Sequence, residues 1–269
     1  MAWGDARITA GSKELEVRYA GPAPEAAPTI VLLHEGLGSA GLWRGFTERL
    51  AAATGFGVAA YSRAGYGHSD AADLPFPLDY MTREAVDVLP EVLDAIGFRR
   101  GVLMGHSDGA TIAAIYAGSV VDHRVRGTIL MAPHFFTEPM GLAEIAKAKD
   151  AFATTDLKAR MAKHHTDPER TFRGWNDAWL AEGFKAWNVG DVIEYFRIPT
   201  LAIQGRQDQY GTLAQIAEVE TRSYAPVDVA ILEGCRHSPH QDKPDEVLAH
   251  VAEFCARLER LEAEVVTLA

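Results

Sequence analysis

Apolar residues along this chain fall into short continuous runs, which alternate with longer stretches where apolar residues recur at helical spacing. Short, continuously apolar runs are typical of parallel strands that helices cover on both faces. We expect seven strands, at residues 15–19, 29–33, 57–61, 101–104, 125–131, 200–204 and 228–232. The clearest helices are expected at residues 42–53, 81–96, 110–118, 213–223 and 245–262. This alternation predicts a doubly wound α/β fold with a mostly parallel sheet flanked by helices.

The alternation stops between residues 134 and 196, where helix formers and aromatic side chains are frequent and no convincing strand occurs. This segment holds three of the chain's five tryptophans, Trp175, Trp179 and Trp187. We therefore predict a helical cap, residues 134–196, inserted over the carboxyl ends of the strands. The core then comprises residues 1–133 and 197–269. Most of the aromatic side chains are expected to pack the cap onto this core.

The composition narrows the class of partner and the compartment. A net charge of −11 argues against a nucleic-acid partner and predicts no attraction for strongly anionic substrates. Only Cys235 and Cys255 are present, which gives no disulfide framework and favours a reducing environment. Residues 1–5 lack the basic and apolar regions of a secretory signal, and no run approaches the ~18 apolar residues of a membrane span. We expect a cytoplasmic protein without a membrane partner, and the sequence leaves a homo-oligomer open.

Residues 105–109 read Gly-His-Ser-Asp-Gly, between an apolar run and a helical pattern. A strand, a tight turn and a helix in this order would expose the Ser107 hydroxyl on the turn. His106, beside it, is expected to pack under the turn. A near copy at residues 67–71, Gly-His-Ser-Asp-Ala, lacks the closing glycine and the helical pattern directly after it. We therefore interpret Ser69 as a loop residue and Ser107 as the candidate nucleophile.

A serine hydroxyl becomes a good nucleophile when a base removes its proton, and a carboxylate best orients that base. Asp208 follows the predicted strand at 200–204, and His237 follows the one at 228–232. Open α/β sheets build their sites at such strand ends, so both residues are candidates.

Other residues compete for these two roles. Asp208 could instead cap the helix at 213–223, although it stands early for that. Asp191 and Asp228 are weaker candidates for the orienting carboxylate because neither follows a suitable strand. His240 competes with the proposed base, but we interpret it as a surface residue or one at a helix start.

These motifs resemble the α/β-hydrolase superfamily over nearly the whole chain. The matching features are the loop His-Glu-Gly-Leu-Gly at 34–38, the run Arg-Ala-Gly-Tyr-Gly-His-Ser-Asp at 63–70, the serine turn, and the late Asp and His. The resemblance implies an α/β-hydrolase fold with an inserted helical cap. It also implies a serine hydrolase with the triad Ser107, Asp208 and His237, working without cofactor.

Acyl transfer also needs donors aimed at the developing oxyanion, and backbone amides suit this role because they are already fixed. One donor is expected to be the amide of Asp108, the residue after the nucleophile. The resemblance puts the other in the loop after residues 29–33, at Gly36 or, alternatively, at Leu37.

Glu35 departs from the family pattern, because it stands where the common His-Gly-x loop has its first glycine. We interpret it as a structural carboxylate that bonds nearby backbone or Arg63, since a negative charge here would oppose the oxyanion. The alternative is that it lines the site and selects substrate or positions water.

Further substrate-binding candidates are His134 and the three cap tryptophans, of which Trp175 and Trp179 share a helical face by their spacing. His164 and His165, with Asp167, look like metal ligands, but adjacent side chains on a helix diverge. We interpret the two histidines as a solvated pair and expect no metal.

The sequence favours an ester as the default substrate, in a small molecule with a partly apolar acyl group. Lactones and thioesters react through the same machinery. The alternatives are a carbon–carbon bond hydrolase or lyase, or a ligand-binding member without catalysis. An arginine of the cap that anchors substrate would favour the carbon–carbon alternative, and the candidates are Arg160, Arg170 and Arg173.

Overall fold

The computed structural model describes residues 6–268. Residues 1–5, on which the expectation of no secretory signal rests, lie outside the described residues. Eight strands form one sheet in the order β1-β2-β4-β3-β5-β6-β7-β8. They are β1 (Ala6–Ala10), β2 (Lys13–Ala20), β3 (Thr29–Leu33), β4 (Gly57–Tyr61), β5 (Gly101–His106), β6 (Val125–Met131), β7 (Thr200–Gly205) and β8 (Val227–Leu232). The strands from β3 onward pair in parallel, whereas β2 is antiparallel to β1 and to β4.

The predicted doubly wound sheet is confirmed, and each predicted strand overlaps an observed one. The eighth strand, β1, escaped prediction because it lies at the sheet edge with only Ile8 and Ala10 buried. In β3, β4, β5 and β7 every residue is buried, and alternate side chains pack into two separate apolar clusters. In β3, for example, Val31 and Leu33 point to one cluster and Ile30 to the other.

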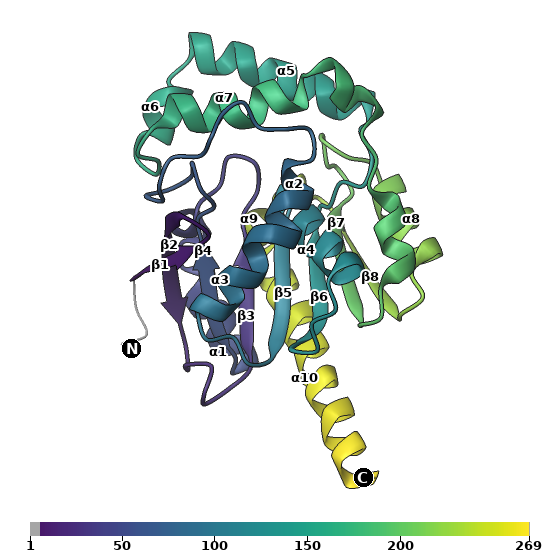
Figure 1. Ribbon diagram of the computed structural model, residues 1–269. Coiled ribbons are helices and arrows are strands. Elements are labelled where there is room, and N and C mark those ends of the chain that lie inside the picture. Colours follow the sequence, from purple (N-terminus) through teal and green to yellow (C-terminus); the bar gives the residue numbers. More distant parts are fainter. Residues whose placement is uncertain (1–5, 269) are drawn as a thin grey trace.

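Helices cover both faces of this sheet (Figure 1). One face carries α2 (Tyr80–Arg83), the π turn η2 (Glu84–Val88), α3 (Leu89–Ala95) and α4 (Asp108–Ser119). The other carries η1 (Ala40–Trp43), α1 (Phe46–Thr54) and α10 (Pro244–Leu268), with the short α9 (Pro239–Asp242) before α10. Another helix, α8 (Ala214–Arg222), connects β7 to β8.

Between β6 and β7 the chain forms α5 (Pro139–Thr154), α6 (Leu157–Met161), α7 (Pro168–Trp179), η3 (Glu182–Ala186) and η4 (Gly190–Tyr195). We call residues 134–196 the inserted segment. Figure 1 shows that α5 and α7 both extend over the end of the sheet where the parallel strands terminate. Stacked rings of Phe152 and Phe172, 4.0 Å apart, join α5 to α7. Across residues 6–268, no helix combines the length and the apolar character needed to cross a membrane.

Candidate active site

Ser107 occupies the tight turn between β5 and α4 and has a φ of 53°, which few residues other than glycine adopt. The two flanking glycines permit this turn. A Cβ atom on Gly105 would lie 2.1 Å from the carbonyl oxygen of Gly109, and one on Gly109 would lie 2.1 Å from that of Leu33. The turn therefore packs tightly against β3 and against α4, and it holds Ser107 at the carboxyl end of β5.

His237 and Asp208 meet across the ends of the last two strands, since Asp208 follows β7 and His237 follows β8. His237 Nδ1 lies 2.8 and 2.9 Å from the two carboxylate oxygens of Asp208, so Nδ1 donates and Nε2 is left as an acceptor. Burial alone would raise the pKa of Asp208, but hydrogen bonds from His237 and from the Tyr210 amide lower it below its usual value. Asp208 is therefore a carboxylate that fixes the tautomer of His237.

A cavity of about 290 Å³ lies between the strand ends and the inserted segment. Ser107 and His237 both line it, from the core. Every other residue predicted to belong to the site also lines it, except Asp208, which lies behind His237, and Trp187. The structure does not bring Trp187 to the cavity, because its ring stacks on Phe184 with centroids 5.0 Å apart.

Three backbone amides at the cavity have no partner within residues 6–268. The N–H groups of Gly36, Leu37 and Asp108 donate no hydrogen bond there, although Gly38 N donates to Glu35 O. The loop at Gly36 touches the inserted segment directly, because a Cβ on Gly36 would lie 2.0 Å from Trp175 Nε1. The residues whose amides are predicted to bind an oxyanion thus line the cavity, and Gly36 lies against the Trp175 ring.

Among residues 6–268, the Glu35 carboxylate bonds neither to Arg63 nor to nearby backbone, the two partners expected of a structural carboxylate. The Arg63 guanidinium instead donates to the carbonyl oxygens of His34 and Glu35, at 2.6 and 3.2 Å. The Glu35 carboxylate turns toward His106, with Oε2 3.4 Å from His106 Nδ1. Arg63 therefore holds the main chain of this loop, and the Glu35 side chain lies at the site.

The Asp108 side chain takes part in a hydrogen-bond chain that reaches the inserted segment. Tyr80 donates its hydroxyl to Asp108 Oδ2, and Trp179 Nε1 donates to the Tyr80 hydroxyl at 3.0 Å. The Asp108 carboxylate thus accepts a hydrogen bond from Tyr80, outside the serine turn.

Two histidines differ from the expectations. His240 is buried rather than at the surface, with its ring 4.7 Å from that of Trp43, although it does begin a helix as the second residue of α9. His165 is buried as well: its Nδ1 accepts from Gly67 N and its Nε2 donates to Leu37 O, at 3.0 and 3.1 Å. We expected solvent around His165, but its ring instead bonds to the main chain of two core loops, at Gly67 and Leu37.

The remaining competitors have other partners. Asp228 pairs with Arg257, and Asp191 pairs with Arg222 at 2.7 Å. Among the described residues no group of three or more His, Cys, Asp or Glu could hold a metal ion.

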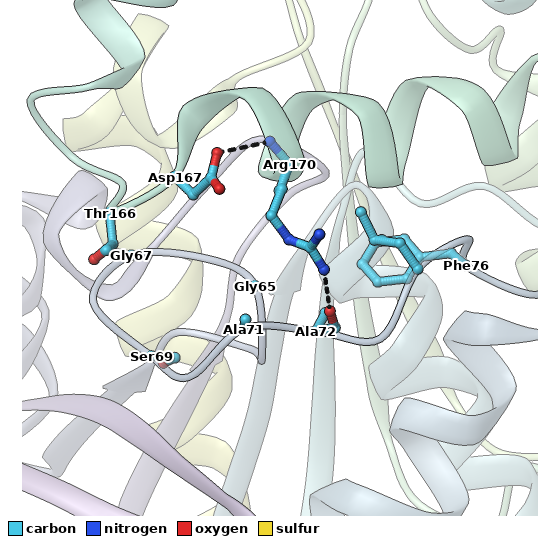
Figure 2. Close-up of a pocket in the computed structure, with 10 residues that line it drawn as sticks. Gly65, Gly67, Ser69, Ala71, Ala72, Phe76, Thr166, Asp167 and Arg170 are labelled. Carbon is cyan, nitrogen blue, oxygen red and sulfur yellow. Dashed lines mark hydrogen bonds between the residues drawn. The ribbon is translucent and has the colours of Figure 1, made fainter.

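Ser69, in the near copy of the motif, lies on a second and smaller cavity (Figure 2). Its hydroxyl donates to Ser62 O at 2.6 Å and accepts from Glu16 N at 2.9 Å. Figure 2 shows Arg170 of α7 reaching over this cavity to the Ala72 carbonyl, at 3.1 Å. The residues that line this cavity include no histidine. Ser69 thus has two structural partners and no base.

Comparison with known proteins places the geometry in a family. Serine hydrolase BPHL of Mus musculus is 26% identical over 162 residues, which cover 57% of this chain and 54% of that protein. The chain thus spans about half the length of the curated relatives it matches first. Among solved structures, proline iminopeptidase of Mycobacterium smegmatis superposes with a TM-score of 0.75 at 19% identity, covering 96% of this chain and 100% of that one.

The enol-lactonase of Burkholderia xenovorans LB400 superposes with a TM-score of 0.73 at 21% identity, covering 93% of this chain and 100% of that one. These similarities confirm the predicted α/β-hydrolase fold. Residues 30–250, most of the chain, match the model of the alpha/beta hydrolase family. The chain belongs to the alpha/beta hydrolase family.

Proposed function

We propose that this chain is a serine hydrolase that cleaves an ester, lactone or thioester through a covalent acyl-enzyme. Ser107 is the nucleophile, His237 the base and Asp208 the residue that orients the base. The observation that carries the proposal is the His237–Asp208 pair, 2.8 Å apart, at the same cavity as a serine held on a strained turn. Such a pair leaves His237 Nε2 as the acceptor that serine activation requires.

The reaction proceeds in two halves. His237 Nε2 takes the Ser107 proton as Oγ bonds to the acyl carbon, and the amides of Asp108 and Gly36, or Leu37, stabilise the oxyanion. His237 then gives this proton to the leaving oxygen or sulfur, and the acyl-enzyme forms. In the second half His237 deprotonates a water, which releases the acid and restores Ser107.

The inserted segment acts in this proposal as a cap that shapes the acyl pocket. Trp175, Trp179 and Ile145 line the cavity with apolar surface from the inserted segment, whereas Ser107 and His237 line it from the core. A volume of about 290 Å³ suits a small-molecule substrate with a partly apolar acyl group.

The carbon–carbon alternative receives no support from the arginines of the inserted segment. None of its three candidate anchors is among the residues that line the cavity. Arg160 lies 3.3 Å from Asp156, Arg173 pairs with Glu169, and Arg170 bonds to Ala72 O. Because an acyl substrate needs no such anchor, we prefer the hypothesis of an ester substrate.

A fluorophosphonate probe tests the proposal, because only an activated serine reacts with it. We expect a single adduct, on Ser107, together with turnover in a panel of esters, lactones and thioesters. Ser107→Ala should lose both the adduct and the turnover, and Ser69→Ala should keep both. An adduct on Ser69, or an active enzyme without any adduct, would contradict the assignment.

A further inference from the structure

His106, the last residue of β5, has a ring that is sealed in the protein and faces an oxygen atom at each nitrogen. Its Nε2 lies 2.7 Å from the main-chain carbonyl oxygen of His237, and its Nδ1 lies 3.4 Å from Glu35 Oε2. The side chain is 1% exposed. The residue before the nucleophile therefore bridges the loop after β3 and the loop that carries the base.

The two partners determine the protonation of this ring. A carbonyl oxygen accepts hydrogen bonds only, and so does an ionised carboxylate. With Glu35 ionised, both contacts are satisfied when each ring nitrogen of His106 carries a hydrogen, which makes the ring an imidazolium with Glu35 as its counter-ion. A neutral ring would turn a bare nitrogen lone pair toward one of the two oxygens.

The surrounding groups fit one charged ring at this position. The rings of His237 and His240 lie 5.1 and 4.9 Å from that of His106. Burial lowers the pKa of His240 to about 3, so that neighbour is neutral. Burial also opposes charge on His106, but the hydrogen bond and the charge of Glu35 outweigh it and raise the pKa of His106, with smaller contributions from the His237 carbonyl and then Asp208.

Glu35 responds in the opposite sense. Burial would raise the pKa of its carboxyl, yet contact with His106 and the nearby histidines brings that pKa well below its usual value. The carboxylate thus stays ionised wherever the enzyme would work.

We propose that Glu35, which is partly buried, and the buried His106 form an ion pair that anchors the main chain of His237 and so positions the catalytic base. This inference rests on the proposed function, because it assigns two positioning residues to the same reaction. The pair also explains why a carboxylate is tolerated beside the amides of Gly36 and Leu37. The charge of the imidazolium cancels that of Glu35, so the developing oxyanion meets no net negative charge from this loop.

Glu35→Gln tests the pair because it removes the charge and keeps the size. NMR titration of the histidine rings, with His106 assigned from the His106→Gln variant, should show the His106 pKa above 6.5 in the wild type and lower in Glu35→Gln. We expect kcat to fall about 10-fold with little change in KM, since a small displacement of a catalytic group costs up to ~100-fold in rate. The wild-type rate should also decline on the alkaline side as His106 loses its proton, and Glu35→Gln should remove that decline.

His106→Phe should lower kcat further than His106→Gln, whose amide can still donate to the His237 carbonyl. Glu16→Gln is the matched control: Glu16 accepts from Ser62 Oγ and His68 N, both outside the cavity, and has a lowered pKa of its own. It should lose stability while kcat and the pH profile stay unchanged.

A neutral His106 in the wild type at pH 6, or a Glu35→Gln enzyme with the kcat and pH profile of the wild type, would overturn the inference. Failure of Ser107 to react with the fluorophosphonate would instead overturn the proposed function. The NMR titration reports on the ion pair in either case, so the two failures are distinguishable.

Discussion

Gly36→Ala tests whether the inserted segment really closes on the loop that carries the proposed oxyanion donors. The added methyl would lie 2.0 Å from Trp175 Nε1 and 2.3 Å from Cδ1. Ordinary contact begins at 3.4 Å, so the indole must retreat by 3.4 − 2.0, or about 1.4 Å. Trp175 is 7% exposed and packs edge-on against Phe172, but it borders the cavity and can shift into it.

The cost should appear in both stability and rate. Overpacking of this kind costs about 1–3 kcal/mol, and each kcal/mol lowers the Tm of a chain of this size by roughly 2–4 °C. A displaced indole narrows the cavity, and a displaced Gly36 amide weakens one proposed oxyanion donor, and loss of such a donor costs about 10²–10³ in kcat. We therefore expect a folded enzyme whose kcat/KM for a small ester has fallen by about 100-fold or more.

Thermal unfolding and ester hydrolysis should be measured together with two further variants. Gly45→Ala is the control, since its added methyl meets nothing within 4 Å and its φ is −68°. It should keep the wild-type rate and Tm. Trp175→Phe, combined with Gly36→Ala, removes the indole atoms that clash and should recover part of the stability. A Gly36→Ala enzyme with the Tm and kcat/KM of the wild type would refute the contact and the reasoning built on it.

Two further predictions concern the base and the inserted segment. His237→Ala and Asp208→Asn should each lower kcat by ~10³ or more in a folded enzyme, measured on the ester that the panel identifies. Asp208→Asn should also abolish a stability component present above the unfolded pKa of ~3.9 and lost as pH falls through the lowered folded value, which unfolding at several pH values would detect. Trp187→Ala should lower Tm without changing the ranking of ester chain lengths, because Trp187 lies outside the cavity, whereas Trp179→Ala should change that ranking. A changed ranking in Trp187→Ala would contradict the position of Trp187 outside the cavity.

The sheet could be predicted because its strands are buried on both faces and therefore read as continuous apolar runs. An edge strand gives no such run, and β1, with alternate residues exposed, was missed for that reason. The helix expected at 81–96 is divided into α2, η2 and α3. Pro90 has no amide hydrogen to donate, and one π turn precedes it. Irregularities of this kind depend on local hydrogen bonding that apolar periodicity does not record.

The candidate site could be predicted as far as strand order determined it. Ser107, Asp208 and His237 each follow a strand, and parallel strands end at one edge of the sheet. The surroundings of His106 and His240 could not be predicted, because three segments distant in sequence meet there: β5, the loop after β3, and α9. No spacing in the sequence indicates which side chain such segments present to each other.

The hydrogen-bond chain from Trp179 through Tyr80 to Asp108 has a consequence for how this fold can acquire a new specificity. It joins α7, which lines the cavity, to the residue whose amide is a proposed oxyanion donor. A change in the inserted segment that removes the donor to Tyr80 should therefore alter substrate preference and turnover together. A lineage that exchanged the inserted segment for one lacking a donor to Tyr80 would disturb the turn that carries Ser107, and selection would have to repair the core before a new specificity became useful.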